Sequence, residues 1–526
     1  MIPPFSERPA WLKSRGYLHI TPKIDVYRKY EEYFTKINDD NFVARHGFFP
    51  LIHSIIKERK YKKTPSGQRA HSYFEDNEYH RTAKLRPLHY ATHIDALIYG
   101  RYAEKLLNLY EDELNNYEGL SDCVIAYRKI PEQEFTGTHE TILEKVQGKS
   151  TIHFASEAFQ EIKERAKDGC VVLMFDIKSF FSELNHQRIK KLWCDLLGVD
   201  RLPAADFNVY NSATQFRYIL RDELRVKQVH KGKRAGFNEK KLALIRKNQG
   251  IEAFFESVED FRNAIEQKRV KVYKDPFVKK GKPVGIPQGL PISAVIANLY
   301  LLEFDISILQ NIVDARGGYY RRYSDDIMII CKPDEAKEIE AFVLEEIEKS
   351  KVEISKQKTE SFLFETATIS PKISRISAYL INDKTMTIGK PLTYLGFEFY
   401  GYQTLIKSSN LSRYYRRMIG SVKRKSRTLG DTSEKKVIFP QRLKKIHRQI
   451  NLGKEKVVVR HKRLVKNNSG FYSFKFRNKK VKSGGSYISY ATRASKHMSA
   501  PYILNQIRKS KSIFHKAMAN HLKEKK

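Results

Sequence analysis

The sequence predicts an α+β fold, because it contains both buried-strand and amphipathic-helix patterns. Val171–Phe175 is an apolar run of strand length that ends at Asp176. Apolar residues then recur at intervals of three and four within Ile189–Leu197, and Gly198 follows them, which is typical of a helix and its end. Earlier in the chain, His93–Tyr99 has the same helical spacing.

A pair of adjacent carboxylates, Asp325 and Asp326, stands between Tyr323 and the apolar run Ile327–Ile330. This pattern predicts two strands joined by a tight turn with both acids at its tip. Neighbouring negative charges repel each other unless a cation lies beside them, and oxygen ligands select a hard cation such as Mg²⁺. Alone, such a pair is most often an ordinary solvated turn, so a metal site needs a further carboxylate.

Asp176 is a candidate for that further carboxylate. A strand that ends in Asp176, beside a hairpin that carries Asp325 and Asp326, would bring three acids together. Three carboxylates can hold two metal ions about 3.5–4 Å apart, the arrangement used for phosphoryl and nucleotidyl transfer. The sequence therefore predicts a two-metal site built from these three aspartates.

A glycine- and proline-rich segment, Gly285–Ser293, reads GIPQGLPIS and precedes an apolar helix pattern from Ala294 to Phe304. Glycine lets the backbone approach a ligand closely, and Gln288 offers both a hydrogen-bond donor and an acceptor. The plain alternative is a loop before a core helix, and the segment by itself does not exclude it.

Three segments, FDIKSFF, GIPQGLPIS and YSDD, occur in this order and resemble motifs A, B and C of reverse transcriptases. Lys356–Glu360 is similar to motif D, Leu392–Phe397 to the primer-grip motif E, and Lys84–Leu88 to the basic fingers motif. Together they span roughly residues 80 to 400. The resemblance is strongest to bacterial enzymes of the group II intron, retron and defence-associated types, and RPLHYATHIDALIYGRYA most resembles the abortive-infection and defence branch.

The resemblance implies a right-hand polymerase fold. Residues 1–165 would form helical fingers and the N-terminal region, 166–400 an antiparallel-sheet palm, and 401–526 a basic, mainly helical thumb and C-terminal extension. The interval between Asp176 and Gly285 is longer than a compact palm needs, so residues 199–280 are interpreted as an insertion of unknown role.

The resemblance also implies roles for single residues. Asp176, Asp325 and Asp326 would be catalytic and would hold two Mg²⁺ ions, with Mn²⁺ as the alternative metal. The expected contacts to the incoming nucleotide and the template come from Lys84, Arg86, Phe181, Gln288, Gly289 and Lys358. The expected primer grip consists of Tyr394, Leu395, Gly396 and Phe397.

Several of these expectations have a specific chemical basis. Arg86, with Lys84, would grip the triphosphate, because a guanidinium matches phosphate oxygens bidentately. Lys358 would act as a general acid near the leaving group. Phe181 stands at the steric-gate position, where a ring would exclude a 2′-hydroxyl; alternatively, Phe181 and its neighbour both belong to the core. Ser324 replaces the Ala or Val common at its position, and serine is small enough to fit there.

The net charge of +37 is concentrated near the end of the chain. Residues 401–526 contain 34 Lys and Arg against four acids, a net of +30, which indicates a polyanionic partner. Phe471–Arg477 alternates aromatic and basic residues before Gly484 and Gly485, which predicts a basic hairpin. Such aromatics either stack on unpaired bases or face a thumb core, and we expect a thumb core with one cationic face.

The four cysteines, Cys123, Cys170, Cys194 and Cys331, form no CxxC pair and have no nearby His at zinc spacing. A reduced, cytoplasmic protein without a structural metal is therefore expected. The N-terminus lacks the basic and apolar blocks of a signal peptide, and no stretch of about 18–20 uncharged apolar residues predicts a membrane span.

The sequence is therefore interpreted as a Mg²⁺-dependent RNA-directed DNA polymerase, a nucleotidyltransferase that uses deoxynucleoside triphosphates, in bacterial antiviral defence. Its expected partners are an RNA template and the DNA product; a dedicated noncoding RNA, a homo-oligomer or a partner protein stays open. The alternatives are a retron or group II intron reverse transcriptase, an RNA-dependent RNA polymerase, and a non-catalytic RNA-binding scaffold. The template and the primer, whether RNA, DNA or a protein hydroxyl, also stay open.

Overall fold

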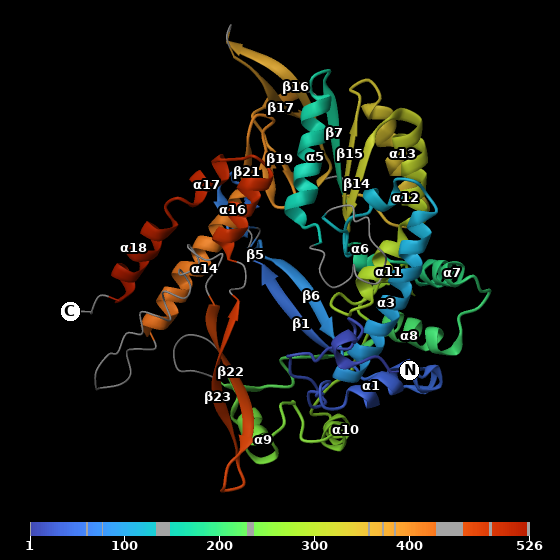
Figure 1. Cartoon of the computed structure of the whole chain (residues 1–526), viewed down its shortest axis with the longest axis vertical. Helices are drawn as coiled ribbons and strands as arrows, with labels where there is room; N and C mark the ends of the chain where they lie inside the picture. Colours follow the sequence, from blue (N-terminus) through green and yellow to red (C-terminus); the bar gives the residue numbers. More distant parts are fainter. Residues whose placement is uncertain are drawn as a thin grey trace.

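The computed structural model of the chain combines a central β-sheet with helices on both of its faces (Figure 1). The predicted mixture of helices and strands is confirmed. The structure describes residues 2–58, 62–75, 77–132, 148–228, 236–355, 358–370, 373–382, 385–427, 456–482 and 486–522.

The central sheet has six antiparallel strands in the order β14–β15–β7–β16–β17–β18. Their bounds are β7 Cys170–Asp176, β14 Tyr319–Tyr323, β15 Asp326–Cys331, β16 Glu360–Ser370, β17 Ile373–Asn382 and β18 Thr385–Ile388.

Two hydrophobic cores lie on opposite faces of this sheet. Leu173 and Phe175 of β7 pack in the core that includes α13 (Ala336–Lys349), whereas Val172 packs in the core that includes α5 (Thr151–Arg165). Successive side chains of a strand point to opposite faces. Burial on both faces therefore explains why β7 is apolar at nearly every position.

A second sheet, in the order β11–β8–β1–β6, lies in the N-terminal region. Its strands are β1 Leu51–Glu58, β6 Lys84–Tyr90, β8 Arg217–Leu220 and β11 Tyr273–Lys274. Strand β1 pairs antiparallel with β6 and parallel with β8. Strands β8 and β11, which both lie within residues 199–280, therefore complete this sheet. Residues 51–90 form strands within the region of residues 1–165 that is expected to be mainly helical.

Short strands form further two-stranded pairs. These are β2 Lys62–Lys63 with β3 Arg69–Ala70, β4 Ser72–Glu75 with β5 Glu78–Arg81, β9 Val226–Gln228 with β10 Gly236–Asn238, and β12 Val278–Lys279 with β13 Lys282–Pro283.

Helices predicted from apolar spacing are present. Helix α3 (His93–Asn115) is capped by Thr92, whose hydroxyl accepts the Asp95 N–H. Helix α7 (His186–Leu197) is capped by Asn185 and ends at Gly198, whose φ of 64° is left-handed. The remaining helices before residue 270 are η1 Phe5–Glu7, α1 Tyr30–Asn38, α2 Asp40–Arg45, α4 Leu120–Cys123, α6 Phe180–Glu183, α8 Ala204–Thr214, α9 Lys240–Gln249 and α10 Val258–Glu266.

The apolar pattern after residue 293 is not one long helix. It forms α11 (Ser293–Tyr300), α12 (Leu302–Ile308) and the π-helical turn η2 (Leu309–Asp314). Within the described residues, no single helix meets the length and apolarity of a membrane span; only the pair 293–300 and 302–314, bent by 43°, meets them together. Most of α11 is buried in the core.

The C-terminal region combines a small sheet, helices and a long hairpin. The sheet consists of β19 Leu392–Tyr394, β20 Phe397–Phe399 and β21 Thr404–Ile406, and the helices are α14 Ser408–Arg427, α16 Tyr487–His497, α17 Tyr502–Ile507 and α18 Ser510–Leu522. The predicted basic hairpin exists as β22 (Lys456–Lys466) and β23 (Tyr472–Lys482). Its turn lies between residues 466 and 472 rather than at Gly484 and Gly485, which lie outside the described residues.

All four cysteines are free and buried. Burial raises the pKa of Cys123, Cys170 and Cys331 to about 12, so these thiols stay protonated and inert at neutral pH.

Asp275 follows β11 and is a half-buried carboxylate. Its Oδ1 accepts the Phe277 N–H at 2.9 Å, while its buried Oδ2 has no hydrogen-bond partner among the described residues. Burial raises the pKa of Asp275 to about 7. Because the folded pKa lies above the usual value of an aspartate, ionisation of Asp275 destabilises the fold.

We expect Asp275→Asn to raise the melting temperature by about 2–4 °C at pH 8. The cost of the native carboxylate develops as the pH rises from about 4 to 7, so the gain should shrink at pH 5 and vanish below pH 4. Thermal melts of both proteins across this range test the prediction. An equal gain at every pH would show that ionisation is not the cause.

Candidate active site

Strands β7 and β15 bring the three predicted aspartates to one end of the central sheet. Asp176 and Asp326 are direct partners in the antiparallel register, and Asp326 also pairs with Tyr323 across the hairpin. Asp325 lies in the turn, where its carbonyl accepts the Ile177 N–H at 3.0 Å. The β14–β15 hairpin and the pairing of β15 with β7 thus bring together Asp176 and Asp326, which are 150 positions apart in the sequence.

Two of the carboxylates at this end of the sheet, Asp325 and Asp326, resist ionisation. Burial raises the pKa of Asp325, and the charge of Asp176 raises it further. Burial, Asp325 and Asp176 together raise the pKa of Asp326 to about 6, against the opposing charges of Lys358 and Lys407. A bound cation would relieve this repulsion.

The donor set fits a hard divalent cation, although the side chains are not preassembled around one. In the described part of the chain, no three His, Cys, Asp or Glu side chains are grouped closely enough to form a metal site. Asp176 instead forms an ion pair with Lys358, whose Nζ lies 2.8 Å from Oδ2. A lysine ammonium therefore supplies the neutralising charge here, and Asp176, Asp325 and Asp326 would hold metal ions.

A cavity of about 980 Å³ opens between this end of the sheet and strand β6. Its lining includes most of the residues expected at the site: Lys84, Arg86, Asp176, Phe181, Gln288, Gly289, Asp325 and Lys358. Asp326 and the expected primer grip do not line it. The cavity has the size of a small-molecule site.

One wall of the cavity is cationic. Burial lowers the pKa of Lys84, as do the neighbouring charges of Arg86 and Lys358, whereas Asp176 and Asp325 oppose the shift. Arg86 lies 3.5 Å from a carboxylate oxygen of Glu58, and Glu58 also pairs with Arg413 of α14. Such a wall suits an anionic ligand that carries several phosphates.

The Gly285–Ser293 segment links strand β6 of this wall to helix α6, which follows β7. The Gln288 carbonyl accepts the His89 N–H at 2.8 Å, and the Ile286 N–H donates to the Phe181 carbonyl at 2.7 Å. A Cβ at Gly289, whose φ is +115°, would lie 2.4 Å from the His89 carbonyl oxygen. Only glycine allows this close approach.

The two adjacent phenylalanines have different surroundings. Phe180 is 3% exposed and belongs to the core, whereas Phe181 is half-buried and lines the cavity. Their rings meet edge to face with centroids 5.7 Å apart.

The expected primer grip forms the turn between β19 and β20, on the side of Asp326. Tyr394 and Phe397 are 2% and 0% exposed, so they support the turn from within the core and offer no surface. Leu395 and Gly396 make the turn itself, with φ of 43° and 92°. The Gly396 carbonyl accepts the Lys407 N–H at 3.0 Å, and the charge of Lys407 lowers the pKa of Asp326.

Part of the chain, including two of the three aspartates, matches a known protein family. Residues 257–399 match the family described as reverse transcriptase (RNA-dependent DNA polymerase). This segment is a reverse transcriptase domain. The matched segment contains Asp325 and Asp326 but not Asp176.

Solved structures that resemble the chain include telomerases. Telomerase from Candida tropicalis, truncated from its C-terminal domain, is 9% identical with a TM-score of 0.34, and the match covers 62% of this chain and 53% of that one. Telomerase from Candida albicans with a TWJ fragment of telomeric RNA is 11% identical with a TM-score of 0.34, and the match covers 74% and 54%. This chain spans about half of either structure. No curated protein matches the sequence significantly.

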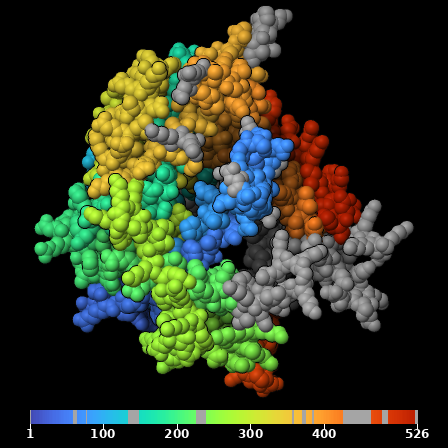
Figure 2. All heavy atoms as spheres, turned by 180° about the vertical axis from the view of Figure 1, so that it is seen from behind, coloured from blue at the N-terminus to red at the C-terminus, as the bar shows by residue number. Residues whose placement is uncertain are grey.

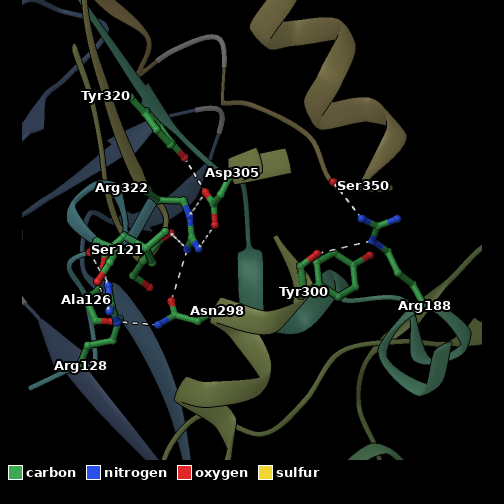
Figure 3. Close-up of polar contacts among 12 residues, drawn as sticks. Ser121, Ala126, Arg128, Arg188, Asn298, Tyr300, Asp305, Tyr320, Arg322 and Ser350 are labelled. Carbon is green, nitrogen blue, oxygen red and sulfur yellow. Dashed lines mark hydrogen bonds and ion pairs between the residues drawn. The ribbon is translucent and has the colours of Figure 1, made fainter. Parts of the chain in front are cut away.

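Behind the aspartates, the reverse transcriptase domain contains a buried polar network (Figure 3). Arg322 and Asp305 are both fully buried and pair bidentately, with Nε–Oδ1 and Nη2–Oδ2 distances of 2.7 and 2.5 Å. Tyr320 donates to Asp305 at 2.6 Å, and Arg322 donates to Asn298 at 3.3 Å. Burial opposes the charge of Arg322, but Asp305 outweighs it and raises the pKa of the guanidinium.

This network reaches the turn that carries Asp325. Arg322 donates to the Ser324 carbonyl at 3.2 Å, and the Ser324 hydroxyl lies 3.1 Å from the hydroxyl of Tyr127. Ser324 has a left-handed φ of 63°, which is unfavourable for a serine unless its surroundings hold it. The serine that departs from the usual motif C therefore has a hydrogen-bonding partner that Ala or Val would lack.

Sequence reasoning missed Arg322, Asp305, Tyr127 and Lys407. One signal was available for Arg322, because strand alternation places it on the same face as Tyr320, toward the core. A charge at a core position requires a buried partner.

Proposed function

We propose that the chain is an RNA-directed DNA polymerase with a right-hand arrangement that joins deoxynucleotides by Mg²⁺-dependent nucleotidyl transfer. The observation that supports this best is the pairing of Asp176 with Asp326, next to Asp325, where Asp176 and Asp325 line a cavity that Lys84 and Arg86 also line. A polymerase needs carboxylates for metal ions and cations for a triphosphate at one place.

The fingers in this proposal are the sheet β11–β8–β1–β6, the palm is the central sheet, and the thumb begins at α14. Figure 2 shows the N-terminal strands, in blue, between the yellow and green segments and the orange and red C-terminal segments. A role in bacterial antiviral defence, in the cytoplasm, rests on the resemblance of Arg86–Ala103 to the defence branch.

In the mechanism, Lys84 and Arg86 bind and orient the phosphates of the incoming nucleotide. Asp176, Asp325 and Asp326 would hold divalent cations, which when bound neutralise charge on the reacting phosphates and activate the primer hydroxyl. Lys358 breaks its ion pair with Asp176 and contacts the pyrophosphate leaving group instead, to which its Nζ can give a proton. Gln288 and Gly289 form the floor on which the nucleotide base lies.

DNA synthesis by the purified protein tests the proposal. We expect it to incorporate labelled deoxynucleotides on a primed RNA template in the presence of Mg²⁺, and to stop when a chelator is added. A non-catalytic RNA-binding scaffold, which the charge of residues 401–526 also suits, would bind the template without incorporation. No incorporation on any primed RNA or DNA template would overturn the polymerase assignment.

The steric gate is tested by Phe181→Ala. Removal of the ring opens space beneath the sugar, so the ratio of kcat/KM for ribonucleotides to that for deoxynucleotides should rise by roughly ten- to hundred-fold. Single-nucleotide incorporation with matched ribo- and deoxynucleotides measures the ratio. Phe181→Tyr keeps the ring and serves as the control with unchanged discrimination. Equal use of both sugars by the wild-type enzyme would favour an RNA polymerase.

A further inference from the structure

The hairpin β22–β23 is strongly basic and lies apart from the residues of the candidate active site. Residues 456–482 contain ten Lys and Arg and no Asp or Glu. Eleven consecutive residue pairs connect the two strands, from Lys456 with Lys482 to Lys466 with Tyr472. A two-stranded hairpin alone is marginally stable in water, so it needs a surface on which to pack.

Helix α9 supplies that surface (Figure 1). The Arg246 guanidinium lies 5.4 Å from the ring centre of Phe474, and the Lys247 Nζ lies 4.3 Å from that of Phe471. Helix α9 and the hairpin approach each other closely at the end of the helix. A Cβ added at Gly250 would lie 2.6 Å from the ring of Tyr472. The hairpin thus docks on a segment more than 200 residues away in the sequence.

The docked face and the free face of the hairpin differ in chemistry. Tyr472 and Phe474 share the docked face, and both are partly buried. Arg463 and Lys475 are direct partners on the opposite face, and Arg477 follows two residues after Lys475 on the same strand. All three cations are exposed.

The three cations are not neutralised by the part of the chain that the structure describes. Among the described residues, none of them forms an ion pair with an Asp or Glu. Like charges directly across two strands destabilise a hairpin, and a polyanion removes that cost. Apart from His461, which is the register partner of Arg477, the positions beside the three cations on this face are Val465 and Ser473, and these two carry no aromatic ring for base stacking. The face therefore suits phosphates of a duplex, whose bases are stacked inside, and a two-stranded ribbon fits along a groove.

We propose that the β22–β23 hairpin is a second nucleic-acid-binding element, in which α9 holds Tyr472 and Phe474 while Arg463, Lys475 and Arg477 grip the phosphate backbone of a duplex. The inference rests on the proposed function for the identity of that duplex, an RNA–DNA hybrid. It assigns residues 240–250 a role as the platform that fixes the hairpin.

The charge of the free face is tested with Arg463→Gln/Lys475→Gln/Arg477→Gln in the full chain. The control, Lys332→Gln/Lys337→Gln/Lys349→Gln, removes the same charge from exposed positions at α13. Affinity for a fluorescent 20-base-pair RNA–DNA hybrid is measured across salt concentrations without Mg²⁺ or nucleotides. The slope of log K against log salt should fall by about 2 to 3 in magnitude for the hairpin variant and stay unchanged for the control. Equal slopes for the two variants, or a loss seen with single-stranded RNA and not with the hybrid, would overturn the proposal.

The platform is tested with Gly250→Ala and Tyr472→Ala. Each should weaken binding of the hybrid. In the double variant the clash at Gly250 disappears with the ring and only the strain of an alanine at a left-handed φ of 69° remains, so the combined loss should be smaller than the sum of the two single losses. Additive losses would contradict a shared docking contact. Since binding is measured without catalysis, a chain that binds through the hairpin but makes no DNA would refute the polymerase function and leave this inference intact.

Discussion

Simultaneous replacement of Asp325 and Asp326 by alanine is expected to abolish DNA synthesis and to leave RNA binding unchanged. The two side chains would hold the metal ions, and loss of several kcal/mol of transition-state stabilisation corresponds to a rate loss on the order of 10³-fold or more. RNA binding should survive, because most of the net positive charge lies after residue 400.

The same double variant should remain folded. Burial and mutual repulsion raise the pKa values of Asp325 and Asp326, so their ionised forms destabilise the native state near neutral pH. Alanine removes that cost, and the melting temperature should stay equal or rise. Asp200→Ala/Asp334→Ala removes two exposed carboxylates and is the matched control with full activity. Incorporation of deoxynucleotides by Asp325→Ala/Asp326→Ala at the wild-type rate would refute the assigned active site.

Disruption of the buried pair behind the site is expected to have the second-largest effect. Arg322→Met leaves Asp305 buried without its cation, which should cost about 3–5 kcal/mol of stability. The Ser324 carbonyl also loses its donor, so the turn that carries Asp325 is no longer held. Thermal unfolding and the rate of single-nucleotide incorporation measure the two consequences separately.

A double variant separates the structural role of this pair from its positioning role. Arg322→Met/Asp305→Leu replaces the pair with apolar side chains, a change that is often neutral or stabilising at buried sites. We expect most of the stability to return while kcat stays low, because neither new side chain can donate to Ser324. Recovery of wild-type kcat together with stability would mean that the pair only supports the core.

Local patterns predicted the elements that carry the site. The strand ending at Asp176, the hairpin around Asp325 and the helix ending at Gly198 are all set by alternation, apolar spacing or a glycine cap within a few residues. Asp176 lies beside Asp326 because strands β7 and β15 pair. The resemblance to known motifs predicted that these two residues lie close together.

Other features depend on distant contacts that no local pattern contains. Strands β8 and β11 are four and two residues long; β8 joins the N-terminal sheet because β1 is available as a partner, and β11 joins it through β8. The network around Arg322 needs Asp305, which lies within an apolar helical pattern where it resembles an ordinary solvated residue. The turn of the β22–β23 hairpin contains Asn467–Gly470. The sequence alone does not distinguish this turn from Gly484–Gly485, because both segments are acceptable turn signals.

Glu58 neutralises arginines from two distant parts of the chain, Arg86 beside the cavity and Arg413 in α14. A phosphate that binds the donors facing Glu58 competes with this carboxylate, and in that case the protein exchanges an internal ion pair for an external one. The release of Glu58 offsets part of the energy gained from the new contact. Dissolved salt screens both pairs, and substrate capture through these arginines should respond to ionic strength less steeply than capture by two unpaired guanidinium groups.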